Sequence, residues 1–326
     1  MFEPFELLNL NFKNCILAPP QSENQANTNG KVNAHMIREY REHATQGVGT
    51  IIIESAYVTK QGRSHVTQLG ISDEEHLEGL QKLIRAIKRE EVVVGIRLAH
   101  AGAKTSDEIC GEQPIAPSSI NMGKDYSTSR EFDKGDCEEI NMFFIHAAER
   151  AEEVGADFIE INGAQQLLFD QCLSSRYNTR DDEYGFQSIE SRLKLSLEVI
   201  ESIRGRISEN MPISYYFSIH DKLDEEVGFE AEDLKIMIEL LTESGVDIFH
   251  PTTIHAMNKF FETDETFIEW VAKFTDRVIV AEGNIKSPQV FKEVYGIGKA
   301  QLYVLDKTLF SRPQWYQFLN RKLISQ

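Results

Sequence analysis

The segment FIEINGAQQLLFD, residues 158–170, ends an apolar run on a group of side-chain amides. Asn162, Gln165 and Gln166 follow the apolar residues directly, and the chain becomes apolar again at Leu167. Amides donate and accept hydrogen bonds without carrying charge, so Asn162 and Gln165 can together hold an oxygen atom of a small ligand. The alternative is that both amides satisfy backbone groups at the end of a strand.

The segment AEGNIKSP, residues 281–288, has the residue types of an anion site. The backbone N–H groups of Gly283 and Asn284 can approach a phosphate group at the start of the helix that is expected to follow. An ordinary Gly-Asn turn before a Ser-Pro helix start has the same residue types. Both interpretations stay open at this point.

The composition excludes several classes of protein. The chain has 326 residues, 41% of them hydrophobic, and a formal net charge of −18. This charge has the wrong sign for a nucleic-acid-binding protein or for a protein attracted to an anionic membrane. The start of the chain lacks the pattern of a secretory signal, and no run of about 18 apolar residues occurs, so a cytoplasmic protein is expected. The cysteines have no metal-site spacing, and we expect reduced thiols and no metal. They are Cys15, Cys110, Cys137 and Cys172.

Short apolar runs alternate with helical patterns along the chain, and these elements must position the polar residues. The runs predict strands at 15–20, 50–55, 92–98, 157–162, 212–218, 247–252, 277–283 and 301–306. The helical patterns lie at 34–46, 73–90, 136–154, 190–204, 230–244, 264–274, 287–295 and 307–321. Nearly continuous apolar strands are typical of a parallel sheet that is buried on both faces. The α/β order therefore predicts a (β/α)8 TIM barrel.

Irregular sequence is unevenly distributed between the two ends of this barrel. Long loops are expected after the third and fourth strands, at 99–135 and 163–189, whereas the connections from helix to strand are short. In a barrel the loops that follow strands lie at the C-terminal face, where sites are built. We expect one domain over 1–326 with its site on that face.

Four motifs carry a resemblance to a known family. The chain resembles the old yellow enzyme family of FMN-dependent NAD(P)H oxidoreductases, on its bacterial, thermophilic-like side. The similarity extends over nearly the whole chain. The motifs are ESAYVTKQGR (54–63), GIRLAHAG (95–102), IAPSSI (115–120) and NTRDDEYGFQSIESR (178–192).

At the flavin ring, the resemblance implies a changed set of contacts. The family has a Gln on the third strand and an Arg on the fifth, and this chain has Arg97 and Tyr216 at these positions. We expect Arg97 to supply the positive charge beside the N1/O2 edge of the flavin, which hydride chemistry requires. The alternative is an ion pair between Arg97 and a neighbouring carboxylate, Glu54 or Glu160.

The first two strands match the family's contacts to the other side of the ring. The resemblance implies that Pro19, Pro20, Gln21 and Ser22 contact the flavin, with the Ser22 hydroxyl directed to flavin O4. Ser55 matches a small residue beneath the ring. The alternative is that these residues only cap the ends of strands.

For the flavin phosphate, the resemblance implies binding at Gly283, Asn284, Asp306 and Lys307. The family has Gly-Arg where this chain has Asp306-Lys307. Lys307 preserves a cation as a point charge, without the bidentate geometry of Arg. The carboxylate of Asp306 beside a phosphate costs on the order of 1–4 kcal/mol unless it turns away.

For the substrate, the resemblance implies that Asn162 and Gln165 replace a His pair that binds the oxygen of an electron-poor acceptor. Neutral amides bind a developing oxyanion less strongly than an imidazolium does. Leu167 stands where the family has a Tyr that donates a proton. Solvent, Tyr177 or Tyr184 would then supply this proton.

Other polar residues are expected to be structural. We interpret Arg180, Asp182, Glu183 and Arg192 as a clasp that holds the 163–189 loop on the barrel. His250, at the end of the sixth strand, is expected to be a satisfied histidine at the rim of the barrel.

The prediction is therefore an FMN-dependent oxidoreductase, similar to an ene-reductase, that uses NADH or NADPH to reduce a small unsaturated or oxidised acceptor. Arg97, Asn162 and Gln165 would be its catalytic residues, and its oligomeric state, including a homo-oligomer, is open. The first alternative is a barrel that has lost its flavin and acts as a binding or regulatory protein. The second is a phosphate-ester lyase or isomerase, ranked lower because no Lys nucleophile or carboxylate pair is evident at the strand ends.

Overall fold

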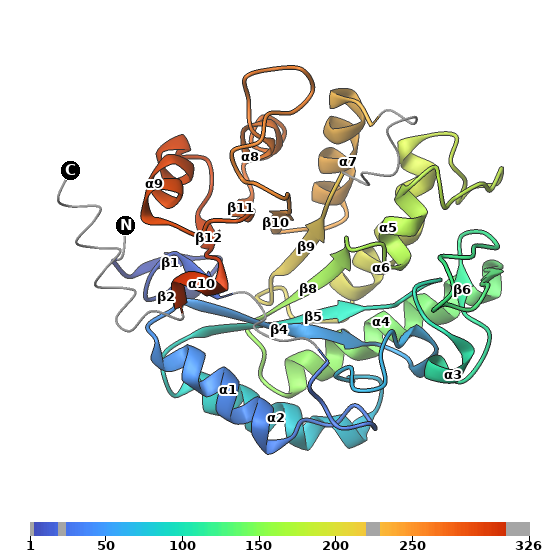
Figure 1. Cartoon of the computed structure of the whole chain (residues 1–326), viewed down its shortest axis with the longest axis horizontal. Helices are drawn as coiled ribbons and strands as arrows, with labels where there is room; N and C mark the ends of the chain where they lie inside the picture. Colours follow the sequence, from blue (N-terminus) through green and yellow to red (C-terminus); the bar gives the residue numbers. More distant parts are fainter. Residues whose placement is uncertain (1–2, 19–23, 220–228, 311–326) are drawn as a thin grey trace.

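Eight parallel strands close into a barrel in the computed structural model, as the sequence predicts (Figure 1). The structure describes residues 3–18, 24–219 and 229–310. Around the barrel the order is β10-β11-β12-β3-β4-β5-β8-β9. The strands are β3 (Ile16–Ala18), β4 (Thr50–Tyr57), β5 (Val93–Ala99), β8 (Phe158–Gly163), β9 (Ile213–Phe217), β10 (Ile248–Pro251), β11 (Val278–Ala281) and β12 (Leu302–Val304).

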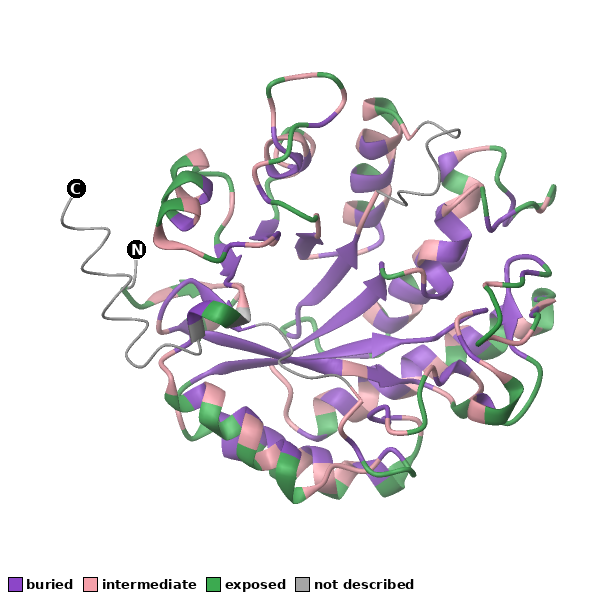
Figure 2. Ribbon diagram, in the orientation of Figure 1, coloured by how far each residue is buried: buried purple, intermediate pink, exposed green. Residues whose placement is uncertain are grey.

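The helices that connect these strands lie on the outside of the barrel. Burial follows this arrangement, because the barrel strands are buried over nearly their whole length while most helices have a buried inner stripe and an exposed outer one (Figure 2). The helices are α1 (Ala34–Thr45), α2 (Leu77–Lys88), α4 (Lys134–Glu153), α6 (Ile189–Arg204), α7 (Ala231–Glu243), α8 (Phe267–Val271), α9 (Pro288–Ile297) and α10 (Lys307–Phe310). The predicted helix at 307–321 extends beyond the described residues. No helix in the described part of the chain is long and apolar enough to cross a bilayer.

Two long loops contain short elements that the apolar pattern did not predict. They are α3 (Asp107–Cys110), β6 (Ile115–Ala116), β7 (Arg130–Glu131) and α5 (Leu168–Leu173). These elements lie beyond the ends of β4, β5 and β8, at the C-terminal face of the barrel (Figure 1). Two 3-10 helices, η1 (Lys60–Gly62) and η2 (Glu74–His76), also follow β4.

A two-stranded hairpin covers the opposite end of the barrel. It consists of β1 (Phe5–Leu7) and β2 (Leu10–Phe12), which pair antiparallel. Phe12 packs with barrel residues such as Leu17 and Ile52 in a separate hydrophobic cluster. The hairpin therefore excludes water from the N-terminal end of the barrel and leaves the C-terminal end for the site.

Candidate active site

A row of charged and polar side chains crosses the barrel interior. Arg97 on β5, Glu160 on β8 and Ser214 on β9 are register partners on neighbouring strands. Arg97 Nε donates to Glu160 Oε1 over 2.7 Å, and Ser214 Oγ donates to Glu160 Oε2 over 2.9 Å. Arg97 is 3% exposed and Glu160 is fully buried, so this is an ion pair inside the barrel.

A histidine and a second carboxylate extend this row toward the mouth. His250 Nδ1, at the end of β10, lies 2.7 Å from Glu160 Oε2. His250 Nε2 lies 3.1 Å from Glu282 Oε2, an ion-pair distance, but the two atoms are not aligned as a hydrogen bond. His250 is 1% exposed, whereas the side chain of Glu282 is 24% exposed. We refer to Arg97, Glu160, His250 and Glu282 as the mouth cluster.

The ionisation states of the four groups in the mouth cluster depend on one another. Burial alone would lower the pKa of His250, but Glu160 and Glu282 outweigh burial and raise this pKa to about 9. Burial alone would raise the pKa of Glu160, but Arg97 and His250 lower it to about 2. The pKa of Glu282 is also lowered, because His250 and Arg97 outweigh its burial. At neutral pH all four groups are therefore charged, and the cluster has no net charge.

The guanidinium of Arg97 retains capacity for a further ligand. It lies over the ring of Tyr216, with its central carbon 3.8 Å from the ring centroid. The hydrogen bond from Nε to Glu160 is its only one within the described residues, so both terminal nitrogens make none. The sequence left open whether Arg97 pairs with a carboxylate, and the pair with Glu160 is confirmed. This pair occupies only one edge of the guanidinium.

We expect the stability of the protein to fall as pH rises toward 9. The folded-state pKa of His250, about 9, exceeds its ordinary value of 6.5. The resulting stabilisation is fully present below pH 6.5 and is lost as pH rises through 9, and it is on the order of 3 kcal/mol. Urea unfolding at a series of pH values measures it. A His250→Gln variant should lack this slope, and an equal slope in the variant would assign the effect to other groups.

The amide cluster lies at the end of β8, as expected, but its two members differ. Asn162 Nδ2 donates to Ser55 Oγ over 3.2 Å and to Gln165 Oε1 over 3.1 Å. Its Oδ1 accepts from the N–H of Ala164 over 3.1 Å. Asn162 is 1% exposed, so its hydrogen bonds are used internally. Asn162 therefore orients Gln165 and matches the structural alternative for this residue.

Gln165 presents its amide outward from a tight turn. Both Gln165 and Gln166 have left-handed backbone conformations, with φ of 62° and 58°. Such conformations in residues other than glycine cost on the order of 1 kcal/mol each and are frequent at functional sites. The side-chain nitrogen of Gln165 makes no hydrogen bond within the described part of the chain and remains available as a donor.

A polar cavity of about 550 Å³ lies above this turn. Ser55, Gln165 and Leu167 are among the residues that line it, and Leu167 is the one aliphatic side chain among its described lining residues. Tyr126, from the 99–135 loop, also lines the cavity, and the sequence reasoning missed this residue. A volume of this size lies within the usual range for sites that bind small molecules.

Neither tyrosine that the sequence suggested as a proton donor lines this cavity. The hydroxyl of Tyr184 donates to the Glu198 carboxylate, 3.1 Å from Oε2. Tyr177 lines a second cavity of about 390 Å³, which shares Tyr126 and Gln166 with the first. Tyr126 is therefore the tyrosine best placed for an acceptor in the larger cavity.

The loops after β11 and β12 meet where a phosphate was expected. Asp306 N–H donates to the carbonyl of Ile285 over 3.0 Å. The carbonyl of Gly283 accepts from the N–H of Ala256 over 2.9 Å, and Asn284 Nδ2 lies 2.9 Å from His255 Nδ1. One face of this turn is thus covered by the loop after β10.

The carboxylate of Asp306 is held within this region. Its Oδ1 accepts from the N–H of Thr308 over 2.9 Å, so it caps the first turn of α10. A negative charge is therefore already bound to a backbone N–H group where the resemblance implied a phosphate. Pro19, Pro20, Gln21 and Ser22 lie outside the described residues, as does the side chain of Lys307.

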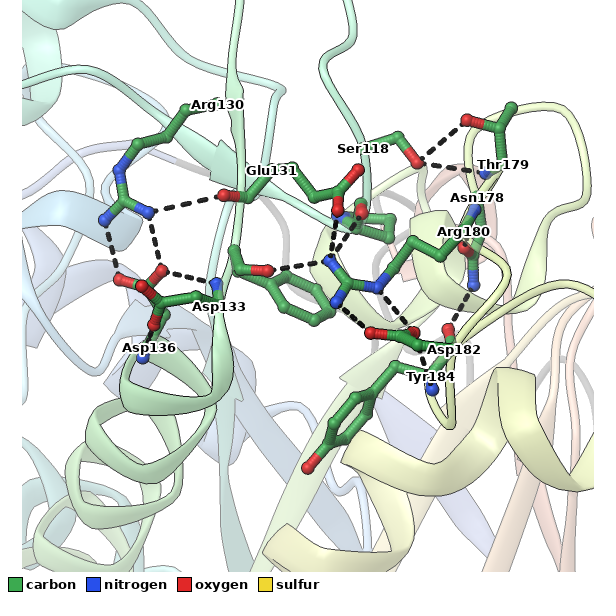
Figure 3. Close-up of polar contacts among 12 residues, drawn as sticks. Ser118, Arg130, Glu131, Asp133, Asp136, Asn178, Thr179, Arg180, Asp182 and Tyr184 are labelled. Atoms are coloured by element: carbon green, nitrogen blue, oxygen red, sulfur yellow. Dashed lines mark hydrogen bonds and ion pairs between the residues drawn. The ribbon is translucent and has the colours of Figure 1, made fainter.

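The predicted clasp on the 163–189 loop is present, and Figure 3 shows its Arg180 and Asp182 contacts. Arg180 binds both carboxylate oxygens of Asp182, and its Nη1 donates to the carbonyl of Phe132 over 2.7 Å. Its guanidinium also lies over the Phe132 ring, 4.7 Å from the centroid. Glu183 pairs with Lys194 at 3.2 Å, and Arg192 donates to the carbonyl of Phe186. The Arg180 contacts hold the 99–135 and 163–189 loops together, and the contacts of Glu183 and Arg192 join the 163–189 loop to α6.

Comparison with known proteins decides the family. The family model of the NADH:flavin oxidoreductase / NADH oxidase family matches residues 1–326. An NADPH dehydrogenase of Clostridium acetobutylicum is 36% identical over 316 residues, which cover 96% of this chain and 92% of that protein. The chain belongs to the NADH:flavin oxidoreductase / NADH oxidase family.

Other members of the family agree with this assignment. An NADH oxidase of Thermoanaerobacter brockii is 30% identical over 97% of this chain, which spans 50% of the length of that relative. The solved structure of an old yellow enzyme homologue from Zymomonas mobilis superposes with a TM-score of 0.82 at 20% identity, covering 93% of this chain and 87% of that one. The predicted family, the TIM barrel and the class of flavin-dependent NAD(P)H oxidoreductases are thereby confirmed.

The family is FMN-dependent, and the two ends of its cofactor fit this chain unequally. At the ring end, the unused nitrogens of Arg97 and the amide of Gln165 offer donors to a polar heterocycle, and Ser55 is a small residue at the cavity wall. At the phosphate end, backbone at Gly283 and Asn284 would face the Asp306 carboxylate. The residues thus fit FMN at its ring and oppose its phosphate with one negative charge.

Sequence reasoning missed the role of two members of the mouth cluster. Glu282 was not considered, and His250 was expected to be a satisfied rim histidine. The structure shows that His250 has a hydrogen-bond partner, as expected, but also that it lies between two carboxylates, which the sequence did not indicate. A signal was present, because each residue interrupts or ends an apolar strand with an ionisable side chain, but their partners lie on other strands.

Proposed function

We propose that this chain is an FMN-dependent NAD(P)H oxidoreductase that reduces a small hydrophilic acceptor. The observation that supports it most strongly is the guanidinium of Arg97 inside the barrel, with two terminal nitrogens that make no hydrogen bond to the described residues. A buried cation with unused donors is costly unless a ligand pairs with it. When bound, FMN would supply hydride transfer from NAD(P)H to the acceptor.

The residues that line the cavity and those of the mouth cluster have separate roles in this proposal. Arg97 binds the electron-rich edge of the cofactor ring, and Tyr216 holds the guanidinium in place from one face. Gln165 donates a hydrogen bond to an oxygen of the acceptor, and Asn162 fixes the orientation of Gln165. Because Leu167 has no proton to give, the hydroxyl of Tyr126 or solvent protonates the acceptor.

The cavity favours a particular class of acceptor. Apart from Leu167 and Tyr126, the described residues that line it are polar or charged. An apolar enone would leave many of these groups without hydrogen bonds, and such loss strongly discriminates between substrates. We therefore expect a hydroxylated, amide-bearing or otherwise polar unsaturated compound, or a polar oxidised one.

The test of this function begins with the colour of the purified protein. We expect protein refolded or dialysed with FMN to retain it, to release FMN on denaturation, and to lose its visible flavin absorbance on anaerobic addition of NADPH or NADH. Reoxidation by a panel of polar and apolar enones then ranks the acceptors. Faster turnover with apolar enones would contradict the acceptor class, and no reduction by either nucleotide would contradict the oxidoreductase.

A second function is favoured by the carboxylate of Asp306. Its contact with the N–H of Thr308 gives the phosphate region a built-in anion, as expected of a barrel that has lost its flavin and binds another ligand. Colourless protein that leaves FMN fluorescence unchanged even at millimolar concentration would support this alternative.

A further inference from the structure

His250 is buried in the mouth cluster, and neither His250 nor Arg97 is among the residues that line the cavity. Its Nδ1 shares the Oε2 atom of Glu160 with the hydroxyl of Ser214, while Arg97 occupies Oε1. The carboxylate of Glu160 therefore contacts two cations, one through each of its oxygens. The ring of Tyr216 lies beside both cations, 4.8 Å from the His250 ring.

We propose that His250 is a positioning residue that neutralises Glu160 and so leaves the positive charge of Arg97 available to an electron-rich ligand at the barrel mouth. Without a second cation, Glu160 and Arg97 would form a neutral ion pair, and little of the guanidinium's positive field would act on a ligand at the barrel mouth. With His250 protonated, the group of three carries one net positive charge. Arg97 is the member with unused donors.

Glu282 has the opposite effect on this charge. Its carboxylate lies on the far side of His250 and is the member of the cluster that is partly exposed. It stabilises the imidazolium, but it also returns the net charge of the mouth cluster to zero. Removing its charge should therefore strengthen the positive field at Arg97, whereas removing the charge of His250 should weaken it.

The groups that face His250 come from three strands and from the residue that follows a fourth. They are Arg97 on β5, Glu160 on β8, Tyr216 and Ser214 on β9, and Glu282 directly after β11. Burial raises the pKa of Tyr216, so its hydroxyl stays neutral. The net charge of the mouth cluster thus depends on two carboxylates and two cations, and their contributions can be separated by substitution.

The first experiment uses the protein without cofactor and measures the pKa of His250 by NMR titration of its imidazole. We expect Glu282→Gln to lower this pKa by about one unit or more, because an ion-pair partner is lost. Arg97→Met should raise it, because a second cation no longer shares Glu160. An unchanged pKa in Arg97→Met would overturn the proposal whether or not the protein binds FMN.

The second experiment rests on the proposed function and measures the midpoint potential of bound FMN. His250→Gln should weaken binding of reduced FMN relative to oxidised FMN by about tenfold, a shift of about −30 mV for a two-electron couple. Glu282→Gln should shift the potential in the positive direction. Glu239→Gln, the same change at an exposed position on α7, should leave it unchanged.

The signs of these shifts in midpoint potential distinguish a positioning role of His250 from a purely structural one. A merely structural role would disturb the site in the same way in His250→Gln and Glu282→Gln, so shifts of equal sign would overturn the proposal. If FMN does not bind at all, the proposed function fails, while the pKa measurements on the apoprotein still decide the role of His250. If His250→Gln does not fold, Glu282→Gln and Arg97→Met carry the test.

Discussion

Replacing Glu160 by Gln is expected to lower the free energy of unfolding by about 3–5 kcal/mol. Glu160 is fully buried and is the shared partner of Arg97, His250 and Ser214. Without the charge of Glu160, the two buried cations lose their common partner. The pKa of His250 must then fall, so that the buried imidazole becomes neutral. Urea denaturation at pH 7, analysed by linear extrapolation, measures the loss.

Two controls define this result. Ser214→Ala removes one hydrogen bond to the same carboxylate and should cost about 1 kcal/mol. Glu239→Gln changes the same functional group on the exposed face of α7 and should stay within about 0.5 kcal/mol of the parent protein. A Glu160→Gln variant that loses less than the Ser214→Ala variant would show that the mouth cluster does not support the barrel.

Replacing Asp306 by Asn is expected to raise the affinity for FMN by about tenfold or more. The substitution removes a negative charge from the place where the family resemblance implies that the cofactor phosphate binds. Asn is also a good capping residue, so it can still accept from the N–H of Thr308 and preserve the first turn of α10. Quenching of FMN fluorescence on titration with protein measures the dissociation constant.

A control at the other end of the barrel tests whether the effect is local. Asp276 is exposed and precedes β11, on the N-terminal side of the strands, so Asp276→Asn changes the net charge equally. It should leave FMN affinity unchanged, because solvent screens charges at that distance. An equal gain in both variants would reflect net charge alone, and no gain in Asp306→Asn would place the phosphate elsewhere.

The fold could be predicted because its signals are local. Each barrel strand is a short apolar run, and β4 and β5 are buried over nearly their whole length, so hydrophobic pattern alone identifies them. The helix at 136–154 was equally predictable, since α4 has apolar residues at helical spacing. The hairpin of β1 and β2 was missed because its strands have three residues each, too few to establish a period.

The short elements in the long loops were missed for a different reason. β6 and β7 have two residues each and pair in parallel across the 99–135 loop. They are held by contacts with the 163–189 loop, among them the hydrogen bond from Arg180 to the carbonyl of Phe132. Structure that depends on another loop leaves little pattern in its own sequence.

The candidate active site also divides into residues that the sequence indicated and contacts that it did not reveal. The residues at the strand ends, such as Arg97, Gln165 and Asp306, were identified as candidates from their types and from a family resemblance. Asn162 was expected to face the acceptor beside Gln165, but its hydrogen bonds are internal. The partners of Asn162 come from β4 and from the turn after β8, so only the tertiary structure decides how this amide is used.

The sequence by itself determined the kinds of chemical group that the barrel mouth contains, because a polar side chain that ends an apolar strand stands at the rim whatever the neighbouring strands carry. Only the tertiary structure decided the charge of that mouth. Arg97 and Glu160 are 63 residues apart, and Glu160 and His250 are 90 residues apart, yet closure of the barrel brings them into contact. The pKa of a buried group depends on such partners at distances of a few ångströms, and neighbours in sequence do not reveal them.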